Sequence, residues 1–124
     1  MRLTLDGTPI DYQERGDGPP LLLLPGGAGH ADIFDGLAAH LADHYRVAAM
    51  SSRLVSARQN GDQHPRVYAE DALGLIDALF DEPPAVFGFS AGAITTLDLL
   101  ARHPERVRLA VVHEPPVAWT KRRG

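Results

Sequence analysis

The sequence has no cysteine, a single tryptophan and no apolar run long enough to cross a membrane. Without cysteine, the chain forms no disulfides and no thiolate metal sites. The densest apolar run covers residues 21–24, far fewer than the roughly 20 residues that a membrane-spanning helix requires. Asp6 and Gly7 follow the N-terminus closely, a pattern that does not fit a signal peptide. We therefore expect a cytoplasmic protein with no membrane partner.

Basic residues are too few to form a nucleic-acid-binding face. The chain has 12 Lys and Arg against 16 Asp and Glu, which gives a net charge of −4, and the charges are scattered. We expect a small-molecule partner, and no pattern indicates a cofactor or a metal site. A length of 124 residues suits one domain that buries roughly two thirds of its unfolded surface. We assign residues 1–118 to this domain and expect residues 119–124 to fray.

The first part of the chain reads as extended structure. Alternating apolar residues on both sides of Asp6-Gly7 predict an antiparallel hairpin over residues 2–15. Residues 21–24 are all leucine and are followed by Pro25-Gly26-Gly27, as expected for a central parallel strand that ends in a tight turn. The glycines in this loop would let its backbone approach a ligand closely, although a plain turn explains them equally well.

Helical and extended patterns then alternate to the end of the chain. Periodicity predicts helices over residues 31–44, 67–80 and 93–101, strands over residues 45–50, 85–89 and 107–112, and a polar loop over residues 51–65. This order predicts an α/β fold, with a mainly parallel sheet, an N-terminal antiparallel hairpin and helices on both faces. Ligands bind such sheets beyond the carboxyl ends of the strands, so the loops after residues 24 and 89 should face one crevice.

The predicted strand over residues 85–89 runs directly into Gly88-Phe89-Ser90-Ala91-Gly92 and then into a helix. A serine on such a strand-turn-helix junction is raised above the sheet edge as a candidate nucleophile. Serine is also a favoured helix N-cap, and the flanking glycines would equally serve close packing of strand against helix. Ser90 is the nucleophile candidate, and capping is the structural alternative.

These residues resemble the first half of an α/β-hydrolase. The resemblance covers roughly residues 3–116 and rests on residues 21–29, on the Gly88–Gly92 turn, and on Val111-Val112-His113-Glu114-Pro115-Pro116. It implies hydrolysis of an ester or other acyl bond through Ser90. It also implies an oxyanion hole made by the backbone N–H groups of Gly27 and Ala91.

The chain departs from the family's pattern in two places. The family's acid and histidine follow the nucleophile along the chain, whereas this sequence continues for about thirty residues after Ser90, so we expect a truncated α/β-hydrolase fold. His113 is the candidate substitute base, with His30 as a second candidate. The other histidines and the carboxylates Asp71, Asp77 and Asp98 read as surface residues. In the loop after residue 50, Arg53 alone matches the family's Asp-Arg-Arg-Gly-like stretch.

Three hypotheses remain open at this stage. The first is a truncated serine hydrolase with low or no activity alone, because a serine without a base is a weak nucleophile. The second is a non-catalytic binding or assembly half, to which a partner chain supplies the missing strands and base. The third is a small esterase that uses His113. In addition, the strand at residues 107–112 would form an open apolar edge, so we expect it to pair in a homodimer or to aggregate.

Overall fold

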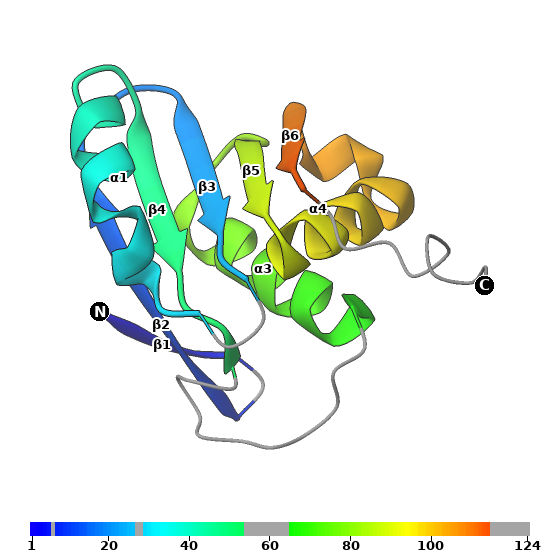
Figure 1. Ribbon diagram of the computed structural model, residues 1–124. Helices are drawn as coiled ribbons and strands as arrows, with labels where there is room; N and C mark the ends of the chain where they lie inside the picture. Colours follow the sequence, from blue (N-terminus) through cyan, green and yellow to red (C-terminus); the bar gives the residue numbers. More distant parts are fainter. Residues whose placement is uncertain (6, 27–28, 54–64, 115–124) are drawn as a thin grey trace, which may run out of the picture.

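The computed structural model describes residues 1–5, 7–26, 29–53 and 65–114 (Figure 1). Strands and helices alternate after an N-terminal hairpin. Their order is β1 (Arg2–Leu5), β2 (Thr8–Arg15), β3 (Pro20–Leu24), η1 (Ala31–Phe34), α1 (Asp35–Leu41), β4 (Arg46–Met50), α3 (Pro65–Leu79), β5 (Ala85–Phe89), α4 (Ala91–Arg102), η2 (Pro104–Arg106) and β6 (Leu109–His113). Within these residues, no helix is both long and apolar enough to span a bilayer.

The described strands form one sheet in the order β1-β2-β4-β3-β5-β6. The hairpin strands join in antiparallel fashion, with β1 on β2 and β2 on β4, and the other neighbours are parallel. Strand β3 lies inside the sheet, where Leu22 is in register with Ala48 of β4 and with Val86 of β5. The predicted α/β class, with a mainly parallel sheet and an N-terminal hairpin, is confirmed.

The leucines of β3 supply the core on both faces of the sheet. Because side chains alternate along a strand, Leu22 and Leu24 pack with Leu75 of α3 and Leu99 of α4. Leu21 and Leu23 face the other way and join the cluster that contains Phe34 and Ala38. Helices therefore cover the sheet from both sides, with η1 and α1 opposite α3 and α4. The carboxyl end of β3 is thereby held at the centre of the molecule.

Two predicted elements have different bounds in the structure. The helix expected over residues 31–44 is a 3₁₀ turn followed by α1, which ends at Leu41; the chain then turns, with the N–H groups of His44 and Tyr45 donating to Leu41 O. The last strand begins at Leu109 rather than at residue 107, because Pro104 starts a 3₁₀ turn and Val107 is buried after it. The expected tail, residues 119–124, and most of the predicted loop lie outside the described residues.

The expectation that Asp71 is a solvated surface residue is wrong. Its side chain is 5% exposed and forms a bidentate ion pair with Arg53, in which Nε and Nη2 each donate over 2.8 Å. Asp71 lies on the inward side of α3, one turn before the buried Leu75. The pair ties α3 to the segment that leaves the carboxyl end of β4. Asp77, by contrast, is exposed and pairs with Arg106, while Asp98 is partly buried beside Arg102 of the same helix.

The central position of β3 predicts a large cost for shortening Leu22, which is fully buried. Leu22→Ala should lower the free energy of unfolding by about 2–5 kcal/mol, because the cavity cannot collapse between strands held on both sides. Ile33→Ala is the matched control, since Ile33 is 54% exposed, and should change stability by less than about 0.5 kcal/mol. Urea denaturation followed by circular dichroism measures both, and equal losses would contradict this packing.

The buried ion pair predicts a second stability difference. Asp71→Asn should destabilise the chain by about 3 kcal/mol, because it removes the negative charge from a largely buried, bidentate ion pair. Asp77→Asn, at a carboxylate that is 53% exposed, should cost less than about 1 kcal/mol. The same urea titration compares them. A small loss at Asp71 would mean that the pair with Arg53 does not hold α3 in place.

Candidate active site

Ser90 lies in a sharp turn between the end of β5 and the first residue of α4. Its backbone has φ +57° and ψ −120°, a combination that costs a residue other than glycine about 1–3 kcal/mol. The surrounding hydrogen bonds hold it there: Ser90 N–H donates to His113 O over 3.0 Å, and Ala93 N–H donates to Ser90 O over 2.9 Å. The Ser90 side chain makes no capping hydrogen bond to α4. The structure therefore gives no support to capping as the role of the hydroxyl.

Glycines on both sides of Ser90 allow the backbone segments to pack closely. A Cβ on Gly88 would overlap Thr96 Oγ1 and Gly92 O, and a Cβ on Gly92 would overlap the carbonyl oxygens of Leu24 and Pro25. The packing reason for these glycines, foreseen from the motif, thus applies at both positions. Close packing at Gly92 brings the N-terminus of α4 against the end of β3.

The loop after β3 lies beside the serine. A Cβ built on Gly26 would be 3.7 Å from Ser90 Cβ, so the two turns border one space, as their positions at strand ends predict. Gly29 N–H donates to Gly26 O over 2.8 Å, and Ser52 N–H donates to Gly29 O over 3.0 Å. Ala91 begins α4, whereas Gly27, the other predicted oxyanion donor, lies outside the described residues.

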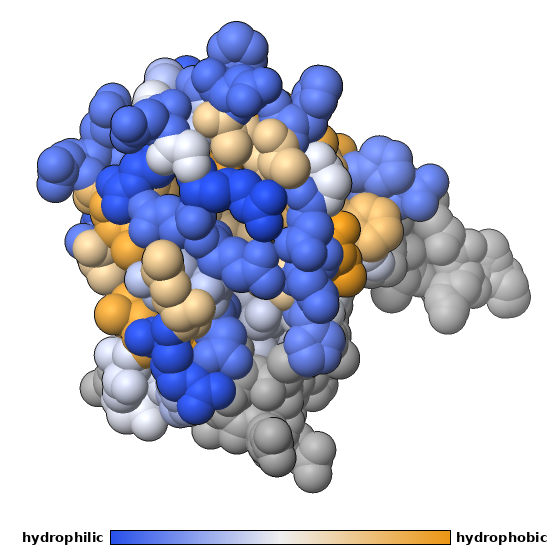
Figure 2. Space-filling model, turned by 90° about the vertical axis from the view of Figure 1, so that its left-hand side faces the viewer, coloured by the Kyte–Doolittle hydropathy of each residue, from blue (hydrophilic) through white to orange (hydrophobic). Residues whose placement is uncertain are grey.

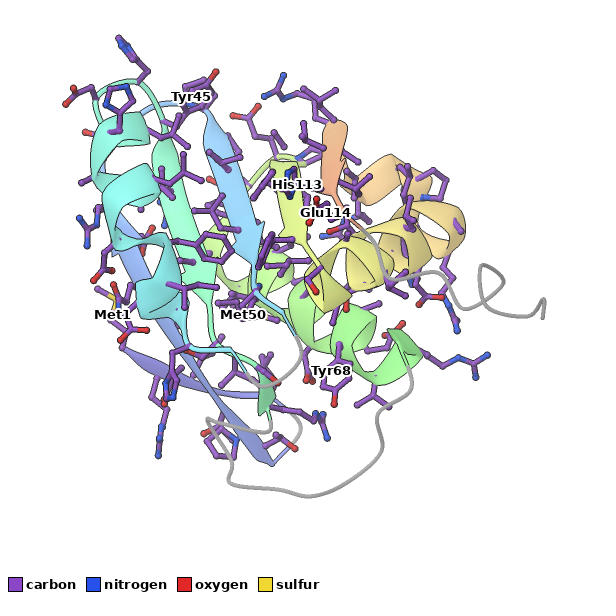
Figure 3. All side chains as sticks on the ribbon, viewed as in Figure 1. Met1, Tyr45, Met50, Tyr68, His113 and Glu114 are labelled. Carbon is purple, nitrogen blue, oxygen red and sulfur yellow. The ribbon has the colours of Figure 1, made fainter. Side chains whose placement is uncertain are left out.

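The carbonyl oxygen of His113 accepts a hydrogen bond from the Ser90 backbone N–H. The His113 ring contacts Phe89. The imidazole stacks on Phe89, with ring centroids 5.9 Å apart and planes inclined by 20°. Figure 3 shows His113 and Glu114 at the carboxyl end of β6. Phe89 and His113 are partners in the β5–β6 register, so their side chains share a face of the sheet. The described contacts therefore place this imidazole against Phe89, and no hydrogen bond between it and the Ser90 hydroxyl is present among them.

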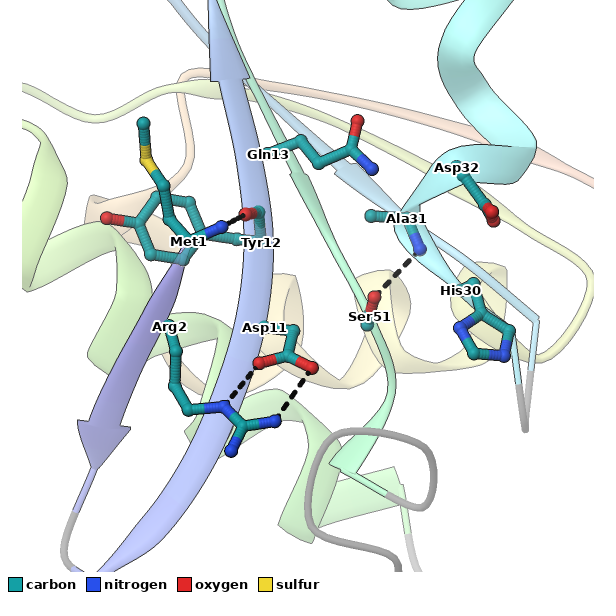
Figure 4. Close-up of a pocket in the computed structure, with 9 residues that line it drawn as sticks. All are labelled: Met1, Arg2, Asp11, Tyr12, Gln13, His30, Ala31, Asp32 and Ser51. Atoms are coloured by element: carbon teal, nitrogen blue, oxygen red, sulfur yellow. Dashed lines mark hydrogen bonds and ion pairs between the residues drawn. The ribbon is translucent and has the colours of Figure 1, made fainter.

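His30, the second candidate base, borders a hollow of about 490 Å³ near the N-terminus (Figure 4). Its other lining residues come from the N-terminus and β1, from β2, from η1 and from the segment after β4: Met1, Arg2, Asp11, Tyr12, Gln13, Ala31, Asp32 and Ser51. The Ser51 hydroxyl accepts a hydrogen bond from Ala31 N–H over 2.8 Å. Hydrogen bonds from the Arg2 guanidinium hold the pKa of Asp11 below its usual value.

The surroundings of the hollow are polar. The side of the molecule that carries α1 and the hairpin is mainly hydrophilic, with apolar residues in scattered spots (Figure 2). Sequence reasoning did not foresee the hollow, because it is formed by residues from four separate segments. The Arg53–Asp71 pair was also missed, although Arg53 had been singled out as a match. Within the described residues, no group of three His, Asp or Glu side chains is arranged to hold a metal ion.

Comparison with known proteins identifies relatives along most of the chain. The model of the alpha/beta hydrolase fold family matches residues 19–122. The uncharacterized hydrolase YraK of Bacillus subtilis (strain 168) is 41% identical over 117 residues, which are 91% of this chain and 43% of YraK. The zearalenone hydrolase of Bionectria ochroleuca is 32% identical over 120 residues, 91% of this chain and 46% of that enzyme.

Solved structures of hydrolases share the fold over most of this chain. A hydrolase from Pseudomonas aeruginosa PA01 superimposes with a TM-score of 0.84 at 26% identity, covering 90% of this chain and 44% of its own. The enol-lactonase from Burkholderia xenovorans LB400 gives a TM-score of 0.82 at 25% identity, covering 90% and 45%. The chain thus spans a little under half the length of these proteins.

The close packing around Ser90 predicts opposite effects of adding one methyl group at two helical glycines. Gly92→Ala should destabilise the chain by about 1–3 kcal/mol or more, because the new Cβ meets backbone carbonyls that cannot move aside. Gly36→Ala in α1 is the control: a Cβ there has open space and should stabilise by about 0.5–1 kcal/mol. Thermal unfolding measures both changes. A harmless Gly92→Ala would contradict the close approach of α4 to β3.

Proposed function

The chain belongs to the alpha/beta hydrolase fold family, and we propose that Ser90 is the nucleophile of a hydrolase that cleaves ester or related acyl bonds. One observation carries the proposal: Ser90 adopts φ +57° and ψ −120° between β5 and α4, and its side chain makes no capping hydrogen bond. Strain of this kind persists where the surrounding structure imposes it and is common at functional sites. The names of the zearalenone hydrolase and the enol-lactonase accord with hydrolysis.

The proposed chemistry proceeds through an acyl-enzyme. Ser90 Oγ attacks the carbonyl carbon, its proton passes to a base, and the carbonyl oxygen becomes an oxyanion. The N–H group of Ala91, at the N-terminus of α4, is one proposed donor to this oxyanion, and that of Gly27 is the other. The alcohol leaves with a proton, and water then releases the acid from Ser90. The position of Gly26 beside Ser90 supports this role for the loop after β3.

In this proposal Ser90 is the nucleophile, and the described residues place no base beside its hydroxyl. A serine hydroxyl needs an adjacent base to react efficiently, and the imidazole of His113 is stacked on Phe89. We therefore propose that these 124 residues alone have low or no turnover. Backbone donors and substrate binding alone can leave a rate roughly 10³–10⁴-fold above that in water. In this proposal, full activity requires an acid and a histidine supplied from outside these residues.

A fluorophosphonate probe tests the nucleophile directly, because it reacts with an activated serine without requiring a known substrate. We expect slow labelling of the folded chain, mapped by peptide mass spectrometry to Ser90, and none after heat unfolding. His113→Ala should label at the same slow rate. Fast labelling that is lost in His113→Ala would instead make His113 the base and this chain a complete small esterase. No labelling at Ser90 at any probe concentration would favour the binding or assembly half.

Ser90→Gly separates loss of the nucleophile from loss of the fold. Glycine adopts positive φ without strain, so this variant should lose labelling yet unfold at a higher temperature, with a gain of about 1 kcal/mol. Ser90→Ala should lose labelling with a much smaller change in stability. If Ser90→Gly is the less stable of the two, the turn stores no strain and the main support for the proposal is removed.

A further inference from the structure

The three residues that leave the carboxyl end of β4 are each bonded to a different part of the fold. Ser51 N–H donates to Asp11 O of β2 over 2.9 Å. Ser52 N–H donates to Gly29 O, in the loop after β3, over 3.0 Å. Arg53 forms its bidentate ion pair with a carboxylate of α3. This segment therefore connects the hairpin, the loop after β3 and α3.

The Ser51 side chain adds a second bond to the loop after β3. Its hydroxyl oxygen accepts a hydrogen bond from Ala31 N–H over 2.8 Å, where the loop ends and η1 begins (Figure 4). Ser51 is 5% exposed and Ala31 is 3% exposed, so loss of the hydroxyl would leave a buried N–H without this partner. The segment after β4 thus holds the loop at two points, Gly29 and Ala31.

A further hydrogen bond connects Gly29 to the part of the loop beside Ser90. Gly29 N–H donates to Gly26 O over 2.8 Å, and a Cβ on Gly26 would lie 3.7 Å from Ser90 Cβ. The Gly26 carbonyl and the N–H group that follows it belong to one planar peptide unit. That N–H group belongs to Gly27, the proposed oxyanion donor. Whatever restrains the Gly26 carbonyl therefore also restrains the proposed donor.

We propose that Ser51 is a positioning residue, which holds the loop after β3 in the place from which it serves an oxyanion at Ser90. This inference rests on the proposed function, because it takes the loop as the source of an oxyanion donor. Oxyanion donors are effective when they are in place before the charge develops. A loop that has lost its bond to Ser51 should therefore slow the reaction even though the nucleophile is intact.

A purely structural role for Ser51 is the alternative. Its hydroxyl satisfies the first N–H group of η1, and a buried N–H without a partner lowers stability wherever it lies. That role alone predicts a less stable chain whose folded form is labelled at Ser90 as fast as the parent chain. The positioning role predicts, in addition, a slower reaction of the folded form.

Fluorophosphonate labelling of Ser90 tests the positioning role, at a temperature where every variant is folded. Ser51→Ala should lower the labelling rate constant by about tenfold, less than the roughly 10²–10³-fold cost of removing an oxyanion donor outright. The rate should fall by the same factor at every pH, because the variant leaves the nucleophile and its proton unchanged. Ser51 borders the hollow, so Ser51→Thr has space for its methyl group, keeps the hydroxyl and should retain the parent rate.

Ile76→Val is the control for stability alone. Ile76 is 1% exposed and packs in the core on the side of α3 and α4, so its shortening should lower stability and leave the labelling rate unchanged. If Ser51→Ala does not fold, Ser51→Cys takes its place, because a thiol of similar shape is a weaker acceptor. Equal labelling rates in the parent chain and in the Ser51 variant that lacks the hydroxyl overturn the proposal.

Hydrogen–deuterium exchange separates failure of this inference from failure of the proposed function. In Ser51→Ala, peptides that cover residues 25–31 should exchange about tenfold faster, while peptides from α3 keep the parent rate. If this loop exchanges faster but Ser90 of the parent chain is never labelled, the proposed function fails, and the inference fails with it. If the parent chain is labelled but Ser51→Ala changes neither exchange nor labelling, the proposed function stands and this inference alone fails.

Discussion

The structure depends on the close approach of the β5–α4 turn to the end of β3. Gly92 leaves no room for a side chain against the carbonyl oxygens of Leu24 and Pro25, and Gly88 leaves none against Thr96 and Gly92. This contact joins the centre of the sheet to the N-terminus of α4. It also places the Gly26 loop beside Ser90, so one steric constraint sets both the packing of the fold and the geometry of the candidate site.

The two edges of the described sheet, β1 and β6, differ in their side-chain interactions. The hairpin closes one side, where the N-terminal amine donates to Tyr12 O and Arg2 pairs with Asp11. Near β4, Arg46 bonds Leu79 O, pairs with Glu14 and lies over the ring of Phe80. The Arg46 side chain thus connects strands β2 and β4 to the end of α3. Beyond β5, the side chains of Leu109, Val111 and Val112 on β6 are exposed instead.

Much of the fold was readable from the sequence because local pattern and tertiary environment agree. The all-leucine run of β3 is apolar on both faces, as a strand covered on both sides requires, and Gly-x-Ser-x-Gly marked the strand-turn-helix junction. Asp71 was wrongly predicted to be exposed because a carboxylate on a helix is usually solvated, whereas this one lies on the inward side of α3. Its partner Arg53 lies 18 residues away in the sequence, beyond any helical spacing. The start of β6 was misplaced because Val107 is apolar and buried yet precedes the strand.

The site was predictable in its backbone and not in its base, for a physical reason. The turn at Ser90 is local: its glycines and its serine with positive φ are close in sequence, so one motif specifies them. A base must reach the hydroxyl from another element, and its position depends on which face of that element it occupies. His113 shows the difference, because strand alternation sets it on the face of Phe89, where the rings stack, while Ser90 lies beyond the end of β5. Pairing along the sheet therefore brings the His113 carbonyl oxygen, and not its imidazole, to the backbone of Ser90.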